Sequence, residues 1–461
     1  MAVDQIEQGR STAKPWRNRV LSTRDAGLLI GGLVVLALLI GTTSNGWIKN
    51  GPSPHPPNSL GHHHRPRRRR HAQSTSLYIH SDLSPWRDEG ITRETVERAR
   101  DKATFRLVVV AGRAYVEKYR PAFQTRNVFT LWGILQLLSR YPGRVPDLDL
   151  MFFCDDTPVV QAAAYPDHSK APPLFMYCKN DTALGIVFPD WTIWGWPEVN
   201  IRPWAPFLEE VARETRRIPW LDRDPYAFWK GNPDVGGRLR GDLMRCNVSH
   251  NGKDGWNARL VRQDWEDADR NGFKGSNLAK QCTYRYKIYV QGRTWSVSQK
   301  YILACGSPVL RIDTTFHDFF SRGLVAGRHY WPIDATHMCP SIKFTVDWGN
   351  AHPVQAQRMG EEGSSFAWDE LSMDNVYDYM LHLLTHYARL LRYRPTVPNN
   401  ATEYCLESMA CPEDGRAGEF MMECMEKYVA DFEPCTLPPS FTLPRSWPED
   451  RGGGQQSQKD A

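Results

Sequence analysis

Short β-branched runs alternate with segments of helical periodicity from about Thr92 onward, and this alternation constrains the fold more than any other feature of the chain. The runs FRLVVVA at 105–111 and LDLMFFC at 148–154 predict buried strands, and a helix is predicted between them at 126–140. Strands separated by helices are typical of parallel α/β sheets rather than of antiparallel sandwiches or barrels. Further strands are predicted at 184–188, 226–229, 286–290 and 309–312, and further helices at 92–102, 206–217, 297–304 and 373–392.

Three polar segments directly follow predicted strands. They are CDDTP at 154–158, WKGNP at 229–233 and QGRTWSVS at 291–298. In parallel α/β sheets, ligands bind beyond the carboxyl ends of the strands. We therefore expect these three segments to contribute to one site.

Asp155 and Asp156, in the first segment, are the best candidates for a general base. A carboxylate beside a like charge at the edge of a cleft can take a proton from an attacking hydroxyl. The alternative is that one of the pair only caps the following turn. Asp147 and Asp149 form a competing D-x-D pair that can hold a divalent ion, although their alternation with leucines more simply predicts the exposed face at the start of a strand.

The second segment contains groups suited to a diphosphate. Gly231, between Lys230 and Asn232, lets the backbone approach a ligand, and a further helix is expected to begin near Leu239, next to Arg238. A helix N-terminus with a nearby arginine favours an anion. A plain loop with a surface arginine fits the spacing equally well.

The third segment places Ser296, Ser298 and Lys300 at the start of another predicted helix. Hydroxyl and amide donors at that position are suited to phosphate oxygens. The alternative is that Ser296 caps the helix.

Tryptophan is abundant, with 17 residues in the chain, and Trp191, Trp194 and Trp196 lie close together in DWTIWGWP. Aromatic faces next to polar groups suit sugar rings, whereas most buried tryptophans only pack a core. Both interpretations apply to these three residues.

The formal net charge of +5 is distributed unevenly over the 461 residues. Residues 1–25 carry +2, residues 26–43 carry no charge and residues 44–71 carry +6, so the 390 residues of the main body, 72–461, carry −3. Nucleic-acid affinity depends on many Lys and Arg contacts to phosphates. A weakly acidic body therefore excludes nucleic acid as the expected partner.

The run AGLLIGGLVVLALLIGTT at 26–43 is free of charge. At 1.5 Å per residue it spans roughly 27 Å, close to the thickness of the hydrocarbon core of a bilayer. A buried core helix or a signal peptide are the alternatives, but we expect an uncleaved transmembrane signal anchor. The basic residues before it predict a cytosolic N-terminus, and the Pro-, His- and Arg-rich residues 44–91 predict a stem.

Cysteines and glycosylation sequons agree with a luminal body. Ten cysteines include a C-terminal cluster of four, which in an oxidising compartment predicts a disulfide staple rather than a zinc site, because no CxxC pair occurs. The cluster consists of Cys405, Cys411, Cys424 and Cys435. Sequons for N-glycosylation occur at Asn180, Asn247 and Asn400.

Six segments, in order, resemble glycosyltransferase family 90, which contains the Rumi-like protein O-glucosyltransferases and the capsule-associated proteins, and the plant members most of all. They are LDLMFFCDDTPVV, FPDWTIWGWPEVNIRPW, PYAFWKGNPDVGGRLRGDLMRCN, CTYRYKIYVQGRTWSVSQKYILACGSPVLRID, FFSRGLVAGRHYWPI and MDNVYDYM. The resemblance implies an α/β fold of two Rossmann-like domains of the GT-B type. We expect these domains at 92–220 and 221–395, with a Cys-containing tail at 396–461.

The resemblance also implies inverting transfer of glucose, xylose or a related sugar from a UDP-sugar to a hydroxyl of a protein or glycan, with an aspartate base and no metal. By position the base matches Asp156, and UDP is expected near residues 230–232, Arg238 and 296–300. The animal members carry arginines where this chain has Pro233 and Ser298. We expect Arg238 and Arg293 to replace them.

The expected location is the Golgi membrane, with the body in the lumen, because the C-terminal SQKDA differs from an ER-retrieval tetrapeptide. Two other functions fit part of the pattern. One is a catalytically silent carbohydrate-binding or scaffold protein on the same fold, and the other is a glycoside hydrolase using Asp155 or Asp156 with a second carboxylate.

Overall fold

The computed structural model describes residues 75–247, 255–312 and 314–437. These residues all belong to one compact unit, 66–461. The predicted cytosolic tail, the anchor at 26–43 and most of the stem lie outside the described residues. Among the helices of the described part, none combines the length and the apolar character needed to cross a bilayer.

The first sheet has six strands in the order β11-β2-β1-β3-β4-β5. Its strands are β1 (Phe105–Val110), β2 (Arg113–Lys118), β3 (Leu148–Phe152), β4 (Leu174–Met176), β5 (Ile186–Val187) and β11 (Thr402–Tyr404). β3, β4 and β5 are parallel, whereas β1 is antiparallel to both β2 and β3. The expectation of purely parallel sheets is therefore wrong for this half of the protein.

A two-residue turn explains the antiparallel pairing of β1 with β2. Ala111 and Gly112 both have positive φ, 51° and 76°, which is the conformation of a type I′ hairpin turn. Val110 consequently pairs with Arg113. The strand β2 escaped prediction because its RAYVEK sequence is rich in charged residues.

The second sheet has five parallel strands in the order β10-β9-β8-β6-β7. They are β6 (Asp224–Gly231), β7 (Ala258–Arg262), β8 (Tyr284–Tyr289), β9 (Val309–Ile312) and β10 (Trp331–Ile333). Because all five strands run the same way, their carboxyl ends meet at one edge. The predicted segments 229–233 and 291–298 lie at that edge, at the end of β6 and just after β8.

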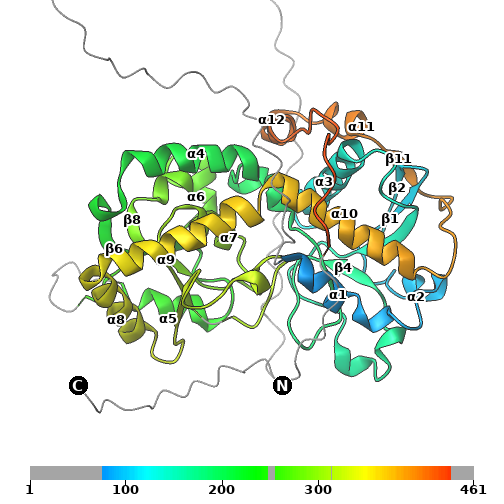
Figure 1. Ribbon diagram of the computed structural model, residues 1–461. Coiled ribbons are helices and arrows are strands. Elements are labelled where there is room, and N and C mark those ends of the chain that lie inside the picture. Colours follow the sequence, from blue (N-terminus) through cyan, green and yellow to red (C-terminus); the bar gives the residue numbers. More distant parts are fainter. Residues whose placement is uncertain (1–74, 248–254, 313, 438–461) are drawn as a thin grey trace, which may run out of the picture. The chain divides into compact units, whose positions relative to one another are not determined.

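Helices cover both sheets (Figure 1). The helix α3 (Arg126–Arg140) has the predicted bounds, and α2 (Arg93–Glu97) is shorter than expected because turns follow it. The remaining α-helices are α1 (Tyr78–Asp82), α4 (Trp204–Arg217), α5 (Arg238–Met244), α6 (Trp265–Arg270), α7 (Ser298–Ala304), α8 (Met338–Ala351), α9 (Pro353–Ser365), α10 (Met373–Leu390), α11 (Leu406–Ala410) and α12 (Gly415–Glu423).

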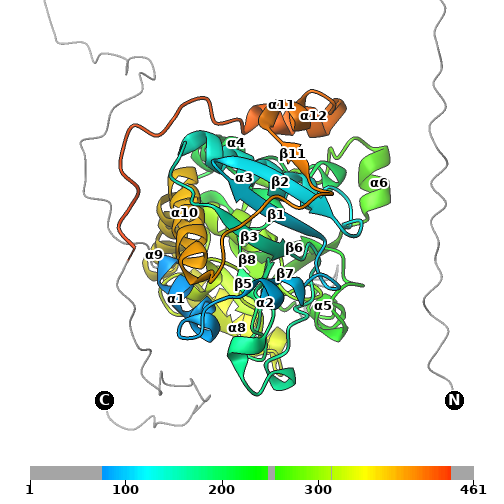
Figure 2. The same cartoon turned by 90° about the vertical axis from the view of Figure 1, so that its right-hand side faces the viewer.

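The C-terminal part of the described chain returns to the first sheet. Helix α10 contacts α3 and β3, and the Tyr387 hydroxyl donates to the Asp149 carbonyl at 2.9 Å. Strand β11 adds to the edge of the sheet next to β2 (Figure 2). The first sheet thus combines strands from residues 105–187 with one strand from residues 402–404.

The predicted disulfide staple in the C-terminal cysteine cluster is wrong. The disulfides of the described residues join Cys246 to Cys339 and Cys282 to Cys305, around the second sheet. Cys405 and Cys411 are exposed free thiols. These two residues cap opposite ends of α11, and a helix holds its ends apart, so they do not pair with each other. Cys424 and Cys435 also form no disulfide.

Candidate active site

The structure separates the roles of the two adjacent aspartates after β3. The Asp155 carboxylate accepts a hydrogen bond of 2.6 Å from the Asp156 backbone N–H, so Asp155 takes the turn-capping role. The Asp156 side chain is 25% exposed, against 57% for Asp155. Asp156 is therefore the more sheltered of the two carboxylates, and it remains the candidate for the general base.

Arg126, the first residue of α3, holds the Asp156 carboxylate. Its Nη1 donates to Asp156 Oδ1 at 2.6 Å, and the arginine side chain is 6% exposed. The guanidinium lies 4.4 Å from the centroid of the Trp191 ring and 5.0 Å from that of Phe123. A cation between aromatic faces is favourably placed, so Arg126 is a fixed partner of Asp156.

Sequence reasoning missed Arg126. The signal was a basic residue at the first position of a predicted helix, where the helix dipole favours an acidic residue. Such a departure from local preference is expected where function requires it.

The three predicted sugar-contacting tryptophans lie in different environments. Trp191 is 1% exposed and supports Arg126 as described above. Trp194 is completely buried and donates its indole N–H to the Tyr377 hydroxyl at 3.1 Å, so it is a core residue and its predicted contact with a sugar is ruled out by position. Trp196 is partly exposed and donates to Gln124 Oε1 at 2.8 Å.

The segment after β8 reaches Asp156 from the second sheet. Thr294 Oγ1 donates to the Asp156 carbonyl at 3.0 Å, and Cys178 Sγ donates to the same oxygen at 3.2 Å. Trp295 packs near Trp191, with ring centroids 6.2 Å apart. The structure thus brings together the predicted segments 154–158 and 291–298.

Arg240 joins the two segments of the second sheet. Its Nε donates to the Gln291 carbonyl at 2.8 Å and its Nη1 to the Asn232 carbonyl at 3.1 Å. Gly236 is required beside it, because a Cβ there would lie 2.2 Å from the Gly292 carbonyl oxygen. Burial lowers the pKa of Arg240 to about 10, so it remains protonated at neutral pH.

Arg238 and Arg293, the two arginines that we predicted for the diphosphate, differ from Arg240 in their surroundings. Both of those side chains are exposed, whereas Arg240 bridges the expected donor segments. Arg238 and Arg240 lie two residues apart on α5, and positions separated by two face different sides of a helix. The sequence alone does not show which side faces the site.

Three of the other predicted donor residues lie in the same region. Lys230 donates from Nζ to the Gly275 carbonyl at 2.6 Å, and burial lowers the pKa of its ammonium. Ser296 and Ser298 are hydrogen-bonded to each other through their hydroxyls, at 2.9 Å.

Asn232 and Gly231 shape the loop at the end of β6. Asn232 Oδ1 accepts from the Asp234 N–H at 2.9 Å, which is an Asx-type turn. A Cβ at Gly231 would lie 2.5 Å from the Trp229 ring. The glycine therefore allows the Trp229 side chain to pack against its own strand.

Lys300 has a different environment from the other predicted donor residues. Its ammonium is 1% exposed and donates to both carboxylate oxygens of Asp190, at 3.3 and 3.2 Å, and to Thr192 Oγ1 at 2.6 Å. These three bonds use the whole donor capacity of the ammonium. Lys300 therefore ties α7 to the DWTIW segment instead of facing a ligand.

The competing D-x-D pair is committed to protein donors. Asp149 is completely buried and accepts from Arg106 Nε and Nη2 at 2.7 and 2.6 Å, so the interpretation of an exposed face is wrong for it. Asp147 accepts from the Ala111 N–H at 2.8 Å in the β1–β2 turn. Across the described residues, no three His, Cys, Asp or Glu side chains are grouped as metal ligands.

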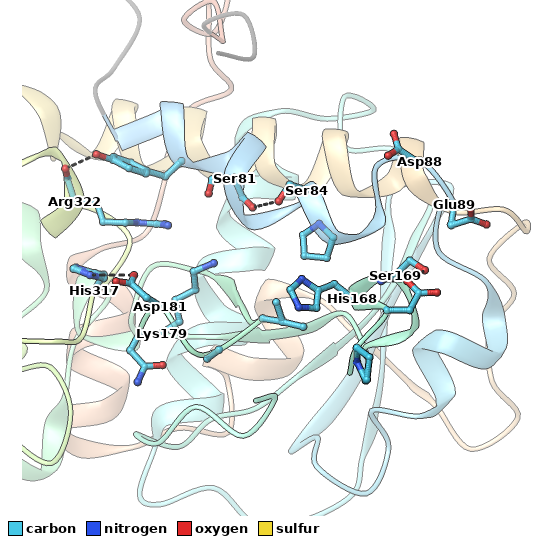
Figure 3. A pocket seen from close by; sticks show the side chains of 17 residues that line it. Ser81, Ser84, Asp88, Glu89, His168, Ser169, Lys179, Asp181, His317 and Arg322 are labelled. Atoms are coloured by element: carbon cyan, nitrogen blue, oxygen red, sulfur yellow. Dashed lines mark hydrogen bonds and ion pairs between the residues drawn. The ribbon is translucent and has the colours of Figure 1, made fainter. Parts of the chain in front are cut away.

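A polar cavity of about 810 Å³ is lined in part by residues 179–181, 183 and 184, which follow Cys178 in the chain (Figure 3). Figure 3 shows Lys179, His317 and Arg322 at one end, Asp88 and Glu89 at the other, and His168 between them. Lys179 and His317 exchange backbone hydrogen bonds of 3.0 and 2.8 Å, which fixes that end.

A buried carboxylate organises the end of this cavity that contains Lys179 and Arg322. Asp82 is completely buried and accepts from Arg322 twice, at 2.7 Å, and from Lys179 at 2.8 Å. Burial alone raises the pKa of Asp82, but the two cations outweigh it and bring the pKa to about 2. Burial and the Arg322 guanidinium lower the pKa of His317 to about 4, so at neutral pH its ring adds no charge to this end, where Asp181 lies 3.9 Å from it.

The three predicted glycosylation asparagines differ in accessibility. Asn400 is exposed. Asn180 lines the polar cavity and accepts from Thr182 Oγ1 at 3.0 Å. The Asn247 amide donates to the Leu260 carbonyl at 3.1 Å and accepts from the Leu260 N–H at 3.0 Å.

Comparison with known proteins identifies one family of glycosyltransferases. A family profile described as glycosyl transferase family 90 matches residues 69–447. The chain is 24% identical to O-glucosyltransferase rumi of Drosophila melanogaster over 326 residues, which is 68% of this chain and 76% of that protein. It is 25% identical to protein O-glucosyltransferase 1 of Homo sapiens over 342 residues, covering 70% and 83%, and 25% identical to the Bos taurus protein of the same name over 332 residues, covering 69% and 80%.

Proposed function

This chain is a member of glycosyltransferase family 90, and on that premise we propose that it transfers glucose, xylose or a related sugar, with inversion, from a UDP-sugar to a hydroxyl of a protein or glycan acceptor. The observation that carries the proposal is the Asp156 carboxylate, held by Arg126 at the point where segments of both sheets meet. The human relative is named a protein O-glucosyltransferase, which supports a protein as acceptor.

In this proposal Asp156 is the general base. Its carboxylate accepts the proton of the acceptor hydroxyl as the hydroxyl oxygen attacks the anomeric carbon, and the bond from that carbon to the UDP oxygen breaks. A single displacement of this kind inverts the anomeric configuration. General base catalysis of this type contributes about 10²- to 10⁴-fold to a rate.

Arg126 positions this base. Its guanidinium is fixed by the Trp191 and Phe123 rings, so the Asp156 carboxylate is held in one orientation before the acceptor arrives. Preorganisation of a reacting group avoids the cost of ordering it during the reaction.

Arg240 and Lys230 stabilise the departing diphosphate. They lie at the carboxyl edge of the second sheet and are partly desolvated, and charge-assisted hydrogen bonds to phosphate are strong in such surroundings. Arg240 thereby offsets the arginines that the animal members carry at the positions of Pro233 and Ser298. With two protein cations in this place we propose that transfer needs no divalent metal, so that EDTA leaves the rate unchanged.

The decisive experiment compares Asp156→Asn with its neighbour Asp155→Asn in the purified full-length chain. Asp156→Asn is expected to lower kcat about 10³-fold while the affinity for UDP stays within a factor of two. Asp155→Asn is the matched control, because it removes a carboxylate one residue away whose bond is to backbone. Wild-type turnover by Asp156→Asn would contradict the assignment.

We further propose that the protein acts in the lumen of the Golgi, anchored by residues 26–43 with its N-terminus in the cytosol. The disulfides Cys246–Cys339 and Cys282–Cys305 support an oxidising compartment. Protection of the body from added protease in intact Golgi vesicles, lost on addition of detergent, is the expected result.

A further inference from the structure

A second hollow, of about 880 Å³, lies on the second sheet away from the candidate active site. Its walls come from β10, α8 and α9, with Trp331 and Trp348 as its two aromatic members. Trp331 is the first residue of β10. The hollow thus adjoins the start of a parallel strand, whereas the expected donor segments follow the ends of β6 and β8, at the opposite edge.

The two indoles form a fixed aromatic wall. Their ring centroids are 5.0 Å apart with an angle of 52° between the planes, and the His352 ring stacks on Trp348 at 4.5 Å and 18°. Both tryptophans are partly exposed. Partly exposed, immobilised aromatic faces offer apolar contact without a loss of side-chain entropy on binding.

Planar polar groups surround this wall. Arg328 forms an ion pair with Glu362 at 3.0 Å, and Gln355 and Arg358 are exposed at the rim. Guanidinium, carboxylate and amide groups each offer hydrogen bonds in fixed directions. A purely apolar ligand would bury these groups without partners, which is unfavourable.

The combination matches one chemical class. A pyranose ring has apolar C–H faces, which fit an indole, and hydroxyls around its edge, which fit planar donors and acceptors. We propose that this hollow binds a pyranose oligosaccharide, at a site separate from the site of sugar transfer. None of its lining residues belongs to the candidate active site, so the proposal stands or falls independently of the proposed reaction.

The test measures binding of cellotriose, xylotriose and maltotriose by titration calorimetry and by saturation-transfer NMR, using the full-length Asp156→Asn protein so that no transfer occurs. At least one of these trisaccharides is expected to bind with a Kd of 1 mM or lower, and saturating UDP is expected to leave that Kd unchanged. Absence of binding by all three, or displacement by UDP, would overturn the proposal.

Four substitutions locate the site. Trp331→Ala and Trp348→Ala are each expected to weaken binding at least 10-fold, and Arg358→Ala, at an exposed position, at least 3-fold. Phe344→Ala is the matched control, because Phe344 is an aromatic residue of α8 that is 63% exposed and lies outside the hollow. If the tryptophan variants unfold, Arg358→Ala alone tests the location of the site. Unchanged trisaccharide binding in that variant overturns the proposal.

A second titration tests the main alternative ligand, a proline-rich peptide. Aromatic grooves also bind proline-rich segments, so the peptide GPSPHPPNSL, which matches residues 51–60, is titrated in parallel. If this peptide binds in a way that depends on Trp348 and no trisaccharide binds, the carbohydrate proposal is overturned in favour of a proline-rich ligand.

Discussion

The Arg126 guanidinium donates a 2.6 Å hydrogen bond to the Asp156 carboxylate, across 30 residues of sequence. It links the start of α3 to the loop after β3 and selects one aspartate of an adjacent pair. The other aspartate, Asp155, lies 3.9 Å from the same guanidinium nitrogen and is mostly exposed. The site is thus organised by a side chain that is itself buried.

Replacement of Arg126 by lysine should slow transfer without weakening donor binding. Lysine keeps the charge but loses the planar group that stacks on Trp191, so the base becomes less well positioned. We expect kcat to fall about 10- to 100-fold, while the Kd of UDP changes less than twofold. Arg113→Lys, at an exposed arginine of β2, is the control. If Arg126→Lys weakened UDP binding by the same factor by which it lowered kcat, the effect would be a general structural one instead.

Arg240 and Arg238 should differ in their effect on donor affinity. Arg240→Ala removes a partly buried cation at the carboxyl edge of the second sheet, and loss of a charge-assisted hydrogen bond costs about 1.5–3 kcal/mol. The Kd of UDP is therefore expected to rise about 10- to 100-fold, whereas Arg238→Ala should leave it within twofold. Calorimetric titration with UDP measures both, and a larger effect for Arg238 would assign the contact with the diphosphate to Arg238 instead of Arg240.

The buried ion pair between Lys300 and Asp190 should matter for stability. Lys300→Met leaves the Asp190 carboxylate, which is 1% exposed, without its cation. Removal of one partner of a buried pair costs about 3–5 kcal/mol. Urea unfolding is expected to show a loss in this range, and Lys343→Met, at an exposed lysine paired with Asp347, should change the free energy of unfolding by less than about 1 kcal/mol.

Acidification should destabilise the fold through His317. The pKa of His317 is about 4 in the folded protein, below the ordinary value of 6.5, so below pH 6.5 the unfolded chain binds the proton that the folded chain excludes. Stability contributed by this difference is present above pH 6.5 and is lost as pH falls toward 4. We expect a loss of about 2 kcal/mol between pH 7 and pH 5, reduced in His317→Gln, by chemical denaturation at both pH values; an equal loss in the variant would assign the effect to other groups.

The acid sensitivity of the same region should have a second phase at lower pH. Asp82 contributes stability above pH 3.8 that is lost as pH falls toward its folded pKa of about 2. This phase lies below the His317 phase, so the two are separable in one pH series. Asp82→Asn is expected to reduce this lower phase, to which Asp334, whose pKa is also lowered to about 2, contributes as well, and to leave the His317 phase in place.

Local sequence determined the elements that place the site. The helix α3 and the strands β1, β3, β8 and β9 lie where periodicity predicted them to within two residues at each end, because the spacing of apolar side chains reflects the period of the local backbone. The same reasoning brought Asp156, Lys230 and Ser296 to strand ends and hence toward one site.

Tertiary structure alone decided which side chains meet there. Arg126 reaches Asp156 and Arg240 reaches Gln291 across 30 and 51 residues of sequence, and Trp194 turns into the core while Trp196 stays partly exposed. The cysteine pairs were also decided at this level, since the bonded partners are 93 and 23 residues apart. Such contacts depend on how elements pack and not on local periodicity, so they are invisible to any pattern confined to one element.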